Sequence, residues 1–391
     1  MSYDFTRLDR LIQRFAEEQT IPGCSVSILQ GGEVLYEQSA GFADIASGRK
    51  VAADSMFRQF STTKLFTYVI LAMLYEEGRF LFSDPVGVYL PEWKTSTKFV
   101  QMPNGEMRVV PTDHPITILQ AVNMTCGLPY CMFPEPDSSN PTVAAMSRQL
   151  MVLLEHGTPT IAEECRAMSQ VPLMFEPGTH WCYGFGSEIM AALVEKFEDK
   201  PLREVFRSRL IEPLELAHAD TYFTEANRSL VVTNYTKQDG KLVPFPGPLD
   251  DAFDPAKTPA GARVNLLTTA HDFAVFMQML ANGGTYRGRK FLGEGTVAML
   301  RTNHLTEAML PDFDNDYLAG YGYGLGFRTL LTQKYGHNGH LGSFGWTGGS
   351  GIWVEADPTA KLSIAYMHNM MPNEELYHHH RVRNVAYGCL L

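Results

Sequence analysis

Two pairs of short, strand-like segments, one near each end of the chain, constrain its fold more than any other feature of the sequence. Residues 24–30 (CSVSILQ) and 33–39 (EVLYEQS) flank Gly31 and Gly32, and residues 351–356 (GIWVEA) and 361–367 (KLSIAYM) flank a turn at Asp357-Pro358. Segments of this length around turn residues are typical of β-hairpins. We therefore expect antiparallel strands from both ends of the chain to form one sheet.

The middle of the chain, in contrast, predicts helices. Apolar residues recur at helical spacing in five segments, and a helix over 5–19 and a closing helix over 373–388 are also expected. The predicted fold class is α+β, an antiparallel sheet flanked by helices with an all-helical insert. We assign residues 1–85 and 262–391 to a sheet domain and 86–261 to a mainly helical domain, with the active site at their interface. The five helical segments are 61–77, 142–156, 185–197, 202–211 and 268–281.

Two long connections rich in Pro and Gly, 127–141 and 243–261, exceed the length of ordinary links, so we expect them to form walls or lids of a functional site. The histidine tract 378–380 predicts a solvent-exposed helix end, because consecutive residues on a helix point in different directions.

The charge balance excludes several classes of partner. The chain has 32 Lys and Arg against 43 Asp and Glu, a net charge of -11, which repels nucleic acid and anionic membranes. The first helix is amphipathic and carries early acidic residues, unlike a signal peptide, and no run of apolar residues is long enough to span a membrane. We therefore expect a cytoplasmic protein without a nucleic-acid or membrane partner. No phosphate-binding glycine loop or paired zinc ligands occur in the sequence, and no cofactor or metal is predicted.

A candidate nucleophile is Ser61, in one of two Ser-x-x-Lys strings. About one such string is expected by chance in a chain of this length, but Ser61 opens a long apolar helical segment, whereas Ser47 lies in a polar turn. Residues three apart share a helix face, so Lys64 can approach the Ser61 hydroxyl. Burial and the helix N-terminus both disfavour the ammonium form, and a neutral Lys64 is then a base for Ser61. The alternative is that Ser61 caps the helix and Lys64 is solvated.

The segment that contains Ser61, residues 21–93, resembles the N-terminal block of the serine beta-lactamase-like superfamily, in its class C and family VIII carboxylesterase branch. Further blocks resemble that family in the same order, and the similarity spans nearly the whole chain. They are TILQAVNMTCGLPY (117–130), PGTHWCYGFGSEIMAALVEK (177–196), NLLTTAHDFAVFMQMLANGG (265–284) and GSFGWTGGSGIWVEADP (342–358). The resemblance implies a beta-lactamase/transpeptidase-like fold with Ser61 as nucleophile.

The family's second motif, Tyr followed by Ser or Ala and then Asn, corresponds to Tyr183-Gly184-Phe185. The resemblance implies that Tyr183 exchanges protons with Lys64 and the nucleophile. Phe185 stands where the family has an amide that contacts an acylamide substrate, which argues against recognition of β-lactams or peptides. Cys126, where relatives carry Ser, and Tyr130 are expected to line the substrate pocket, with packing as the alternative for both.

The third motif corresponds to Trp346-Thr347-Gly348, in place of the Lys-Thr-Gly of penicillin-binding relatives. We expect these three residues to contact substrate and the backbone N–H groups of Ser61 and Gly349 to form the oxyanion hole. A second register, His337-Asn338-Gly339, leaves a longer distance to the Asp357-Pro358 turn than the family's short strand allows. Trp346 has no charge to bind a carboxylate, so an uncharged ester fits better.

These residues predict a serine hydrolase that cleaves small carboxylic esters through an acyl-enzyme. The alternatives are transfer of the acyl group to an alcohol, beta-lactamase or D,D-peptidase activity, and, from another class, a non-catalytic binding protein with the same fold. The sequence does not predict the oligomeric state or the natural substrate.

Overall fold

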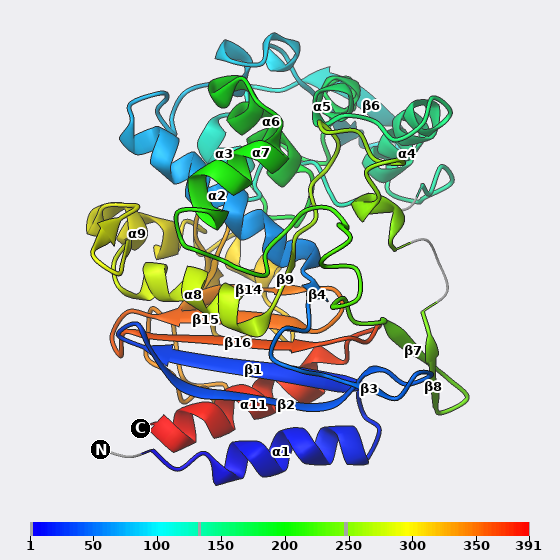
Figure 1. Cartoon of the computed structure of the whole chain (residues 1–391). Coiled ribbons are helices and arrows are strands. Elements are labelled where there is room, and N and C mark those ends of the chain that lie inside the picture. The colour runs from blue at the N-terminus through cyan, green and yellow to red at the C-terminus, as the bar shows by residue number, and fades with distance from the viewer. Residues whose placement is uncertain (1–2, 132–133, 246–248, 391) are drawn as a thin grey trace.

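An eight-stranded antiparallel sheet joins the two ends of the chain (Figure 1). In the computed structural model, which describes residues 3–131, 134–245 and 249–390, strand β1 (Gly23–Gln30) pairs with β2 (Glu33–Asp44) on one side and with β16 (Leu362–His368) on the other. The expected sheet built from both chain ends is therefore confirmed. Its other strands are β3 (Arg49–Lys50), β12 (Tyr321–Tyr323), β13 (Arg328–Leu330), β14 (Phe344–Gly348) and β15 (Ile352–Asp357).

Helices cover both faces of this sheet. Helix α1 (Thr6–Glu17) and helix α11 (Glu375–Leu390) lie together below it in Figure 1, and α8 (Ala270–Ala281) packs on the opposite face. The apolar stripe of α1 is buried, as its helical spacing predicts. Its side chains form one core with residues of α11 and the lower sheet face, while α8 belongs to a second, larger core.

The histidine tract lies inside the molecule, so the predicted solvent-exposed helix end is wrong. His378 and His379 are 0% and 1% exposed, and the ring of His378 packs edge-on against Phe15 of α1. Burial lowers the pKa of both imidazoles, to about 4 for His378. The reason is tertiary, because α11 packs against α1, and His378 lies against Phe15 of α1 and His368 of β16.

Helix α2 (Thr63–Glu76) is the centre of the larger core. Nearly all of its residues from Leu65 to Leu74 are fully buried, which explains why the segment is apolar on every side. Each of the five predicted helical segments contains a helix. Besides α2 and α8, the helices are α3 (Ile118–Val122), α4 (Pro141–Leu154), α5 (Ile161–Met168), α6 (Gly186–Glu198), α7 (Leu202–Phe206) with a π-turn at Arg207–Ile211, α9 (Glu294–Arg301) and α10 (Leu310–Phe313).

Residues 86–261 are not all helical. Two hairpins, β5 (Thr97–Gln101) with β6 (Met107–Pro111) and β7 (Tyr235–Gln238) with β8 (Lys241–Pro244), lie in this range. The division of the chain into two domains stays a prediction. Short strand pairs elsewhere are β4 (Phe57–Arg58) with β9 (Leu267–Thr268) and β10 (Thr285–Tyr286) with β11 (Arg289–Lys290).

The two long connections are only partly described, since residues 132–133 and 246–248 fall outside the described residues. The second connection contains a short 3-10 helix, Asp251–Phe253. Within the described part of the chain, no helix combines the length and the apolar character needed to cross a membrane.

Candidate active site

Ser61 lies in a 3-10 turn, Phe60–Thr62, between β4 and α2. Phe60, directly before it, has a φ of 48°, a conformation that non-glycine residues adopt at a cost. The Lys64 Nζ donates a hydrogen bond of 3.4 Å to the Ser61 Oγ. The residue at the N-cap position of α2 is Thr62, and Ser61 makes no side-chain cap for this helix. The geometry therefore favours the Ser61–Lys64 pair over the capping alternative.

The surroundings of Lys64 differ from the expectation of a neutral amine. Burial by itself lowers the pKa of Lys64, as the sequence suggested, but the nearby Tyr183, Tyr130 and Glu188 outweigh burial and raise that pKa above its ordinary value. The Nζ lies 5.1 Å from the ring centroid of Tyr130 and 5.4 Å from that of Tyr183. The raised pKa favours the ammonium form of Lys64, in contrast to the neutral base expected from the sequence.

Tyr183 reaches this site because the chain around it packs closely against the 124–129 segment. The Cys182 N–H donates to the Met124 carbonyl at 3.0 Å, and Gly184 forms an isolated bridge with Pro129. A Cβ on Gly184 would lie 1.9 Å from the carbonyl oxygen of Leu128. Only glycine fits this approach, which accounts for the departure from the family's Ser or Ala after the tyrosine.

The Tyr183 hydroxyl is buried and makes no hydrogen bond of ordinary geometry among the described residues, although it lies close enough to Lys64 to help raise the pKa of that amine. Such groups are rare in folded proteins and call for a reason. Contacts of its ring hold this phenol in place beside the Ser–Lys pair. Its oxygen is therefore available for proton transfer.

The third motif lies on β14, directly beside the turn that carries Ser61. A Cβ on Gly348 would be 2.3 Å from the carbonyl oxygen of Gln59, so the strand requires glycine for this contact. Gly348 pairs with Ile352 of β15, in the register expected from the short turn. His337 lies outside any strand and contacts the Ala319 carbonyl at 2.9 Å. The Trp346-Thr347-Gly348 register therefore fits the structure, and the His337 register does not.

A cavity of about 360 Å³ opens at Ser61. Its lining includes Lys64, Tyr130 and Gly349 among the predicted site residues. This volume is at the lower end of the range for small-molecule sites. Apolar side chains form most of the remaining wall: Phe60, Ile161, Ala191, Leu202, Leu249, Ala252, Phe253, Val264 and Met371.

Other predicted substrate contacts do not line this cavity. Trp346 is 7% exposed and packs against Tyr183, and Phe185 and Cys126 are 3% and 1% exposed. Burial raises the pKa of the Cys126 thiol to about 11. The packing alternative fits Cys126, whereas the predicted substrate contact of Phe185 is not seen in the cavity lining. Thr347 follows Trp346 on β14 without reaching the cavity wall.

A buried ionic group on the cavity wall had not been predicted. The Arg263 guanidinium bridges Glu188, with Nη1 3.2 Å from its Oε1, and Glu164, with Nε 2.5 Å from its Oε2. The Ser187 hydroxyl also donates to Glu188, at 2.5 Å. One signal was available, because Glu188, five residues after Tyr183, is the one charged residue in the buried part of α6, Gly186–Val194. In the described residues, no three His, Cys, Asp or Glu side chains are arranged to hold a metal ion.

Comparisons with known proteins give a matching family model and several relatives. The family model described as Beta-lactamase matches residues 8–387. An uncharacterized protein of Mycobacterium tuberculosis is 26% identical over 375 residues, 93% of this chain and 89% of the relative. Esterase EstB of Burkholderia gladioli is 24% identical over 246 residues, 61% of this chain and 59% of the relative.

Solved structures share the fold across nearly the whole chain. One is EstCE1, described as a hydrolase with promiscuous acyltransferase activity, with a TM-score of 0.79, 22% identity and 98% of both chains covered. Another is a family VIII carboxylesterase, with a TM-score of 0.69, 19% identity and coverage of 98% of this chain and 97% of that one.

Proposed function

Because the chain belongs to the beta-lactamase family and is by family a beta-lactamase-related serine hydrolase, we propose that it cleaves small, uncharged carboxylic esters through an acyl-enzyme on Ser61. The observation that carries the proposal is the hydrogen bond of 3.4 Å between the Lys64 Nζ and the Ser61 Oγ, at the mouth of a largely apolar cavity. An esterase among the relatives supports the choice of substrate class.

In the first step, the Ser61 Oγ attacks the ester carbonyl and its proton passes to the oxygen of Tyr183. We assign the proton-accepting role to Tyr183, since an ammonium has no lone pair and Lys64 carries its positive charge beside the phenol ring. This role requires Tyr183 to enter the reaction as a phenolate, with the Lys64 ammonium beside its ring as the counter-charge. The backbone N–H groups of Ser61 and Gly349 are assigned to the developing oxyanion.

The tetrahedral intermediate then collapses. The bond to the alcohol oxygen breaks, and Tyr183 returns the proton to that leaving oxygen, which releases the alcohol. In the second step a water molecule attacks the acyl carbon and gives its proton to Tyr183. The bond to the Ser61 Oγ breaks, Tyr183 returns the proton to the Oγ, and the carboxylic acid leaves.

The charges that line the cavity favour an uncharged substrate. Its cationic side chains are Lys64, Arg58 and Arg263. Arg58 is paired with Asp250, and Arg263 with Glu164 and Glu188. Among the described residues that line the cavity, no guanidinium is left unpaired to bind the carboxylate of a penicillin or a peptide.

Transfer of the acyl group to an alcohol is the second candidate. It uses the same acyl-enzyme, with an alcohol in place of water in the second step. The description of EstCE1, with its promiscuous acyltransferase activity, favours testing it. Adding a short alcohol to the ester assay and measuring new ester against free acid separates the two outcomes.

The test of the proposed function compares the protein and its Ser61→Ala variant with p-nitrophenyl butyrate and with nitrocefin. We expect ester turnover by the unmodified protein, little nitrocefin cleavage, and a loss of ester turnover of more than about a thousandfold in the variant. Nitrocefin cleavage at a rate comparable to ester turnover would favour beta-lactamase activity instead. No turnover of either compound would favour the non-catalytic alternative.

A further inference from the structure

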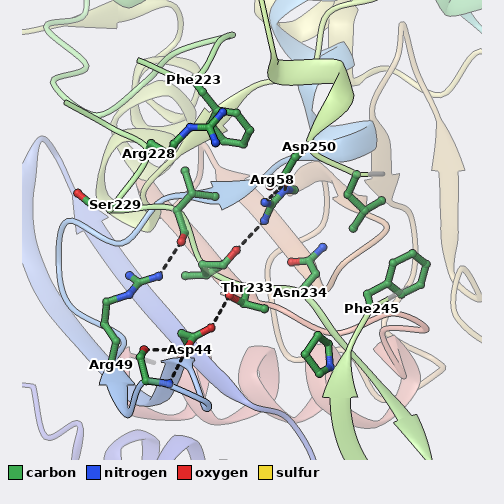
Figure 2. Close-up of a pocket in the computed structure, with 15 residues that line it drawn as sticks. Asp44, Arg49, Arg58, Phe223, Arg228, Ser229, Thr233, Asn234, Phe245 and Asp250 are labelled. Carbon is green, nitrogen blue, oxygen red and sulfur yellow. Dashed lines mark hydrogen bonds and ion pairs between the residues drawn. The ribbon is translucent and has the colours of Figure 1, made fainter. Parts of the chain in front are cut away.

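A second cavity lies next to the catalytic one (Figure 2). Its volume is about 560 Å³, and it shares Arg58 and Leu249 with the catalytic cavity as common wall residues. The rest of its lining is mixed, with an apolar part formed by Phe223, Val231, Val232, Pro244 and Phe245 and a polar part that includes Asp44, Arg49, Arg228 and Asn234. The two spaces are therefore adjacent, and the side chains of Arg58 and Leu249 stand between them.

The guanidinium of Arg58 is held by the Val232 carbonyl and by one carboxylate, that of Asp250, whose side chain is 59% exposed. The Arg58 side chain is 7% exposed, its Nη1 donates to the Val232 carbonyl at 2.6 Å, and its Nε donates to the Asp250 Oδ1 at 3.1 Å. The Nη2 contacts the same Oδ1 (Figure 2). Without Asp250, a buried guanidinium would lose its counter-charge, and such a group is expected to move toward solvent.

Asp250 also holds one end of the segment that closes the catalytic cavity. The other end is anchored separately, since Phe253 is 2% exposed, packs with Met56 and Leu267, and accepts a backbone hydrogen bond of 2.9 Å from Phe223. The end at Leu249 is tied to the core through the carboxylate of its neighbour Asp250. Loss of that carboxylate should free Leu249 and Arg58 together, the two residues common to both cavities.

We propose that the Arg58–Asp250 ion pair is a specificity-determining partition, which closes one end of the catalytic cavity and limits the length of the apolar group of the ester. The inference rests on the proposed function for its substrate class. With the pair intact, the cavity accepts short apolar chains. With the pair broken, a longer chain extends past Arg58 into the second cavity, among Phe223, Val231 and Phe245.

The test uses Asp250→Ala with Asp251→Ala as the matched control. Asp251 is the next residue, and its carboxylate pairs with the exposed Lys257 at 2.6 Å. The kcat/KM values for p-nitrophenyl octanoate and p-nitrophenyl butyrate are measured for each variant. We expect the octanoate-to-butyrate ratio to rise at least about tenfold in Asp250→Ala, mainly through a lower KM for octanoate, because added methylenes become buried. The control should keep the original ratio. An unchanged ratio in Asp250→Ala, or an equal rise in both variants, would overturn the partition.

A second measurement makes the outcome independent of turnover. Methyl ketones that carry the same short and long chains are titrated into Ser61→Ala protein, with and without Asp250→Ala, by calorimetry. We expect a gain in affinity of at least about tenfold for the long ketone alone. If neither ester is turned over but this gain occurs, the proposed function fails and the partition stands. If esters are turned over but the affinities for long and short ketones rise equally or not at all, the partition fails alone.

Should Asp250→Ala not fold, Asp250→Asn is measured in the same way. This variant keeps the size of the side chain and removes its charge, and its ratio and affinities should change in the same direction.

Discussion

The phenol ring of Tyr183 stacks on the indole ring of Trp346, with ring centroids 5.4 Å apart and planes inclined at 28°. The ring of Tyr130 lies near it as well, with centroids 5.6 Å apart. Aromatic contacts therefore hold Tyr183 in place without a hydrogen bond from its hydroxyl. Trp346 therefore helps to position the phenol of Tyr183, although it does not line the cavity.

Replacing Tyr183 with Phe removes only the oxygen that we assign to proton transfer. We expect kcat for p-nitrophenyl butyrate to fall by about a hundredfold or more. The thermal midpoint should change little, because the ring contacts remain and the hydroxyl bonds no described residue. Tyr130→Phe is the matched control, since Tyr130 also lies near Lys64, and it should lose less than about tenfold. A Tyr183→Phe variant with nearly full activity would show that the proton is accepted elsewhere.

The charge of Glu188 should appear in the pH profile. Glu188 is one of the groups that raise the pKa of Lys64, so Glu188→Gln lowers that pKa. Because the mechanism uses Lys64 as an ammonium, activity is lost as the pH rises through its pKa. We therefore expect the alkaline decline of kcat/KM to begin at a lower pH in Glu188→Gln than in the unmodified protein.

Glu164→Gln is the control for this shift. Glu164 contacts Arg263 as Glu188 does, but it is not one of the groups that raise the pKa of Lys64. The alkaline decline of kcat/KM in Glu164→Gln should therefore begin at the same pH as in the unmodified protein. Identical profiles for Glu188→Gln and the unmodified protein would contradict the assigned role of the ammonium.

The buried histidines predict a loss of stability in acid. Burial lowers the pKa of His378 from its ordinary 6.5 to about 4, so the unfolded chain binds the proton more readily than the folded chain. The contribution to the free energy of unfolding is complete above pH 6.5 and is lost as the pH falls through that range to about 4. His337 and His380 also have pKa values of about 4 and act in the same direction.

Urea denaturation over a series of pH values measures this effect. Between pH 6.5 and about 4, we expect the free energy of unfolding to fall less in His378→Phe than in the unmodified protein, by roughly 2–3 kcal/mol. His114→Asn, at an exposed position, should follow the unmodified protein. Parallel curves for all three proteins would mean that His378 does not contribute.

Local patterns in the sequence were sufficient for the sheet and for the central pair of the site. The turns at Gly31-Gly32 and Asp357-Pro358 separate strands that pair as expected. The spacing of Ser61 and Lys64 on one turn likewise led directly to their contact. Each of these features depends on residues close together in the chain.

Features that depend on distant segments were missed. The pKa of Lys64 is raised by Tyr130, Tyr183 and Glu188; the family resemblance placed the two tyrosines at the site, but no local pattern predicted Glu188 there. The burial of His378 follows from its packing against Phe15 of α1 and His368 of β16, which lie far from it in the sequence. The hairpin at β5 and β6 carries little buried surface, so its alternation of apolar and polar residues is weak.

The account depends most on Ser61 as the residue that carries the acyl group. Rapid acid quenching of the reaction with p-nitrophenyl butyrate, followed by mass spectrometry of the digested protein, locates that group. We predict one butyryl group on the peptide that contains Ser61, and none on that peptide in Ser61→Ala. A butyryl group on another residue that accumulates and decays at the turnover rate, or full turnover by Ser61→Ala, would contradict the account.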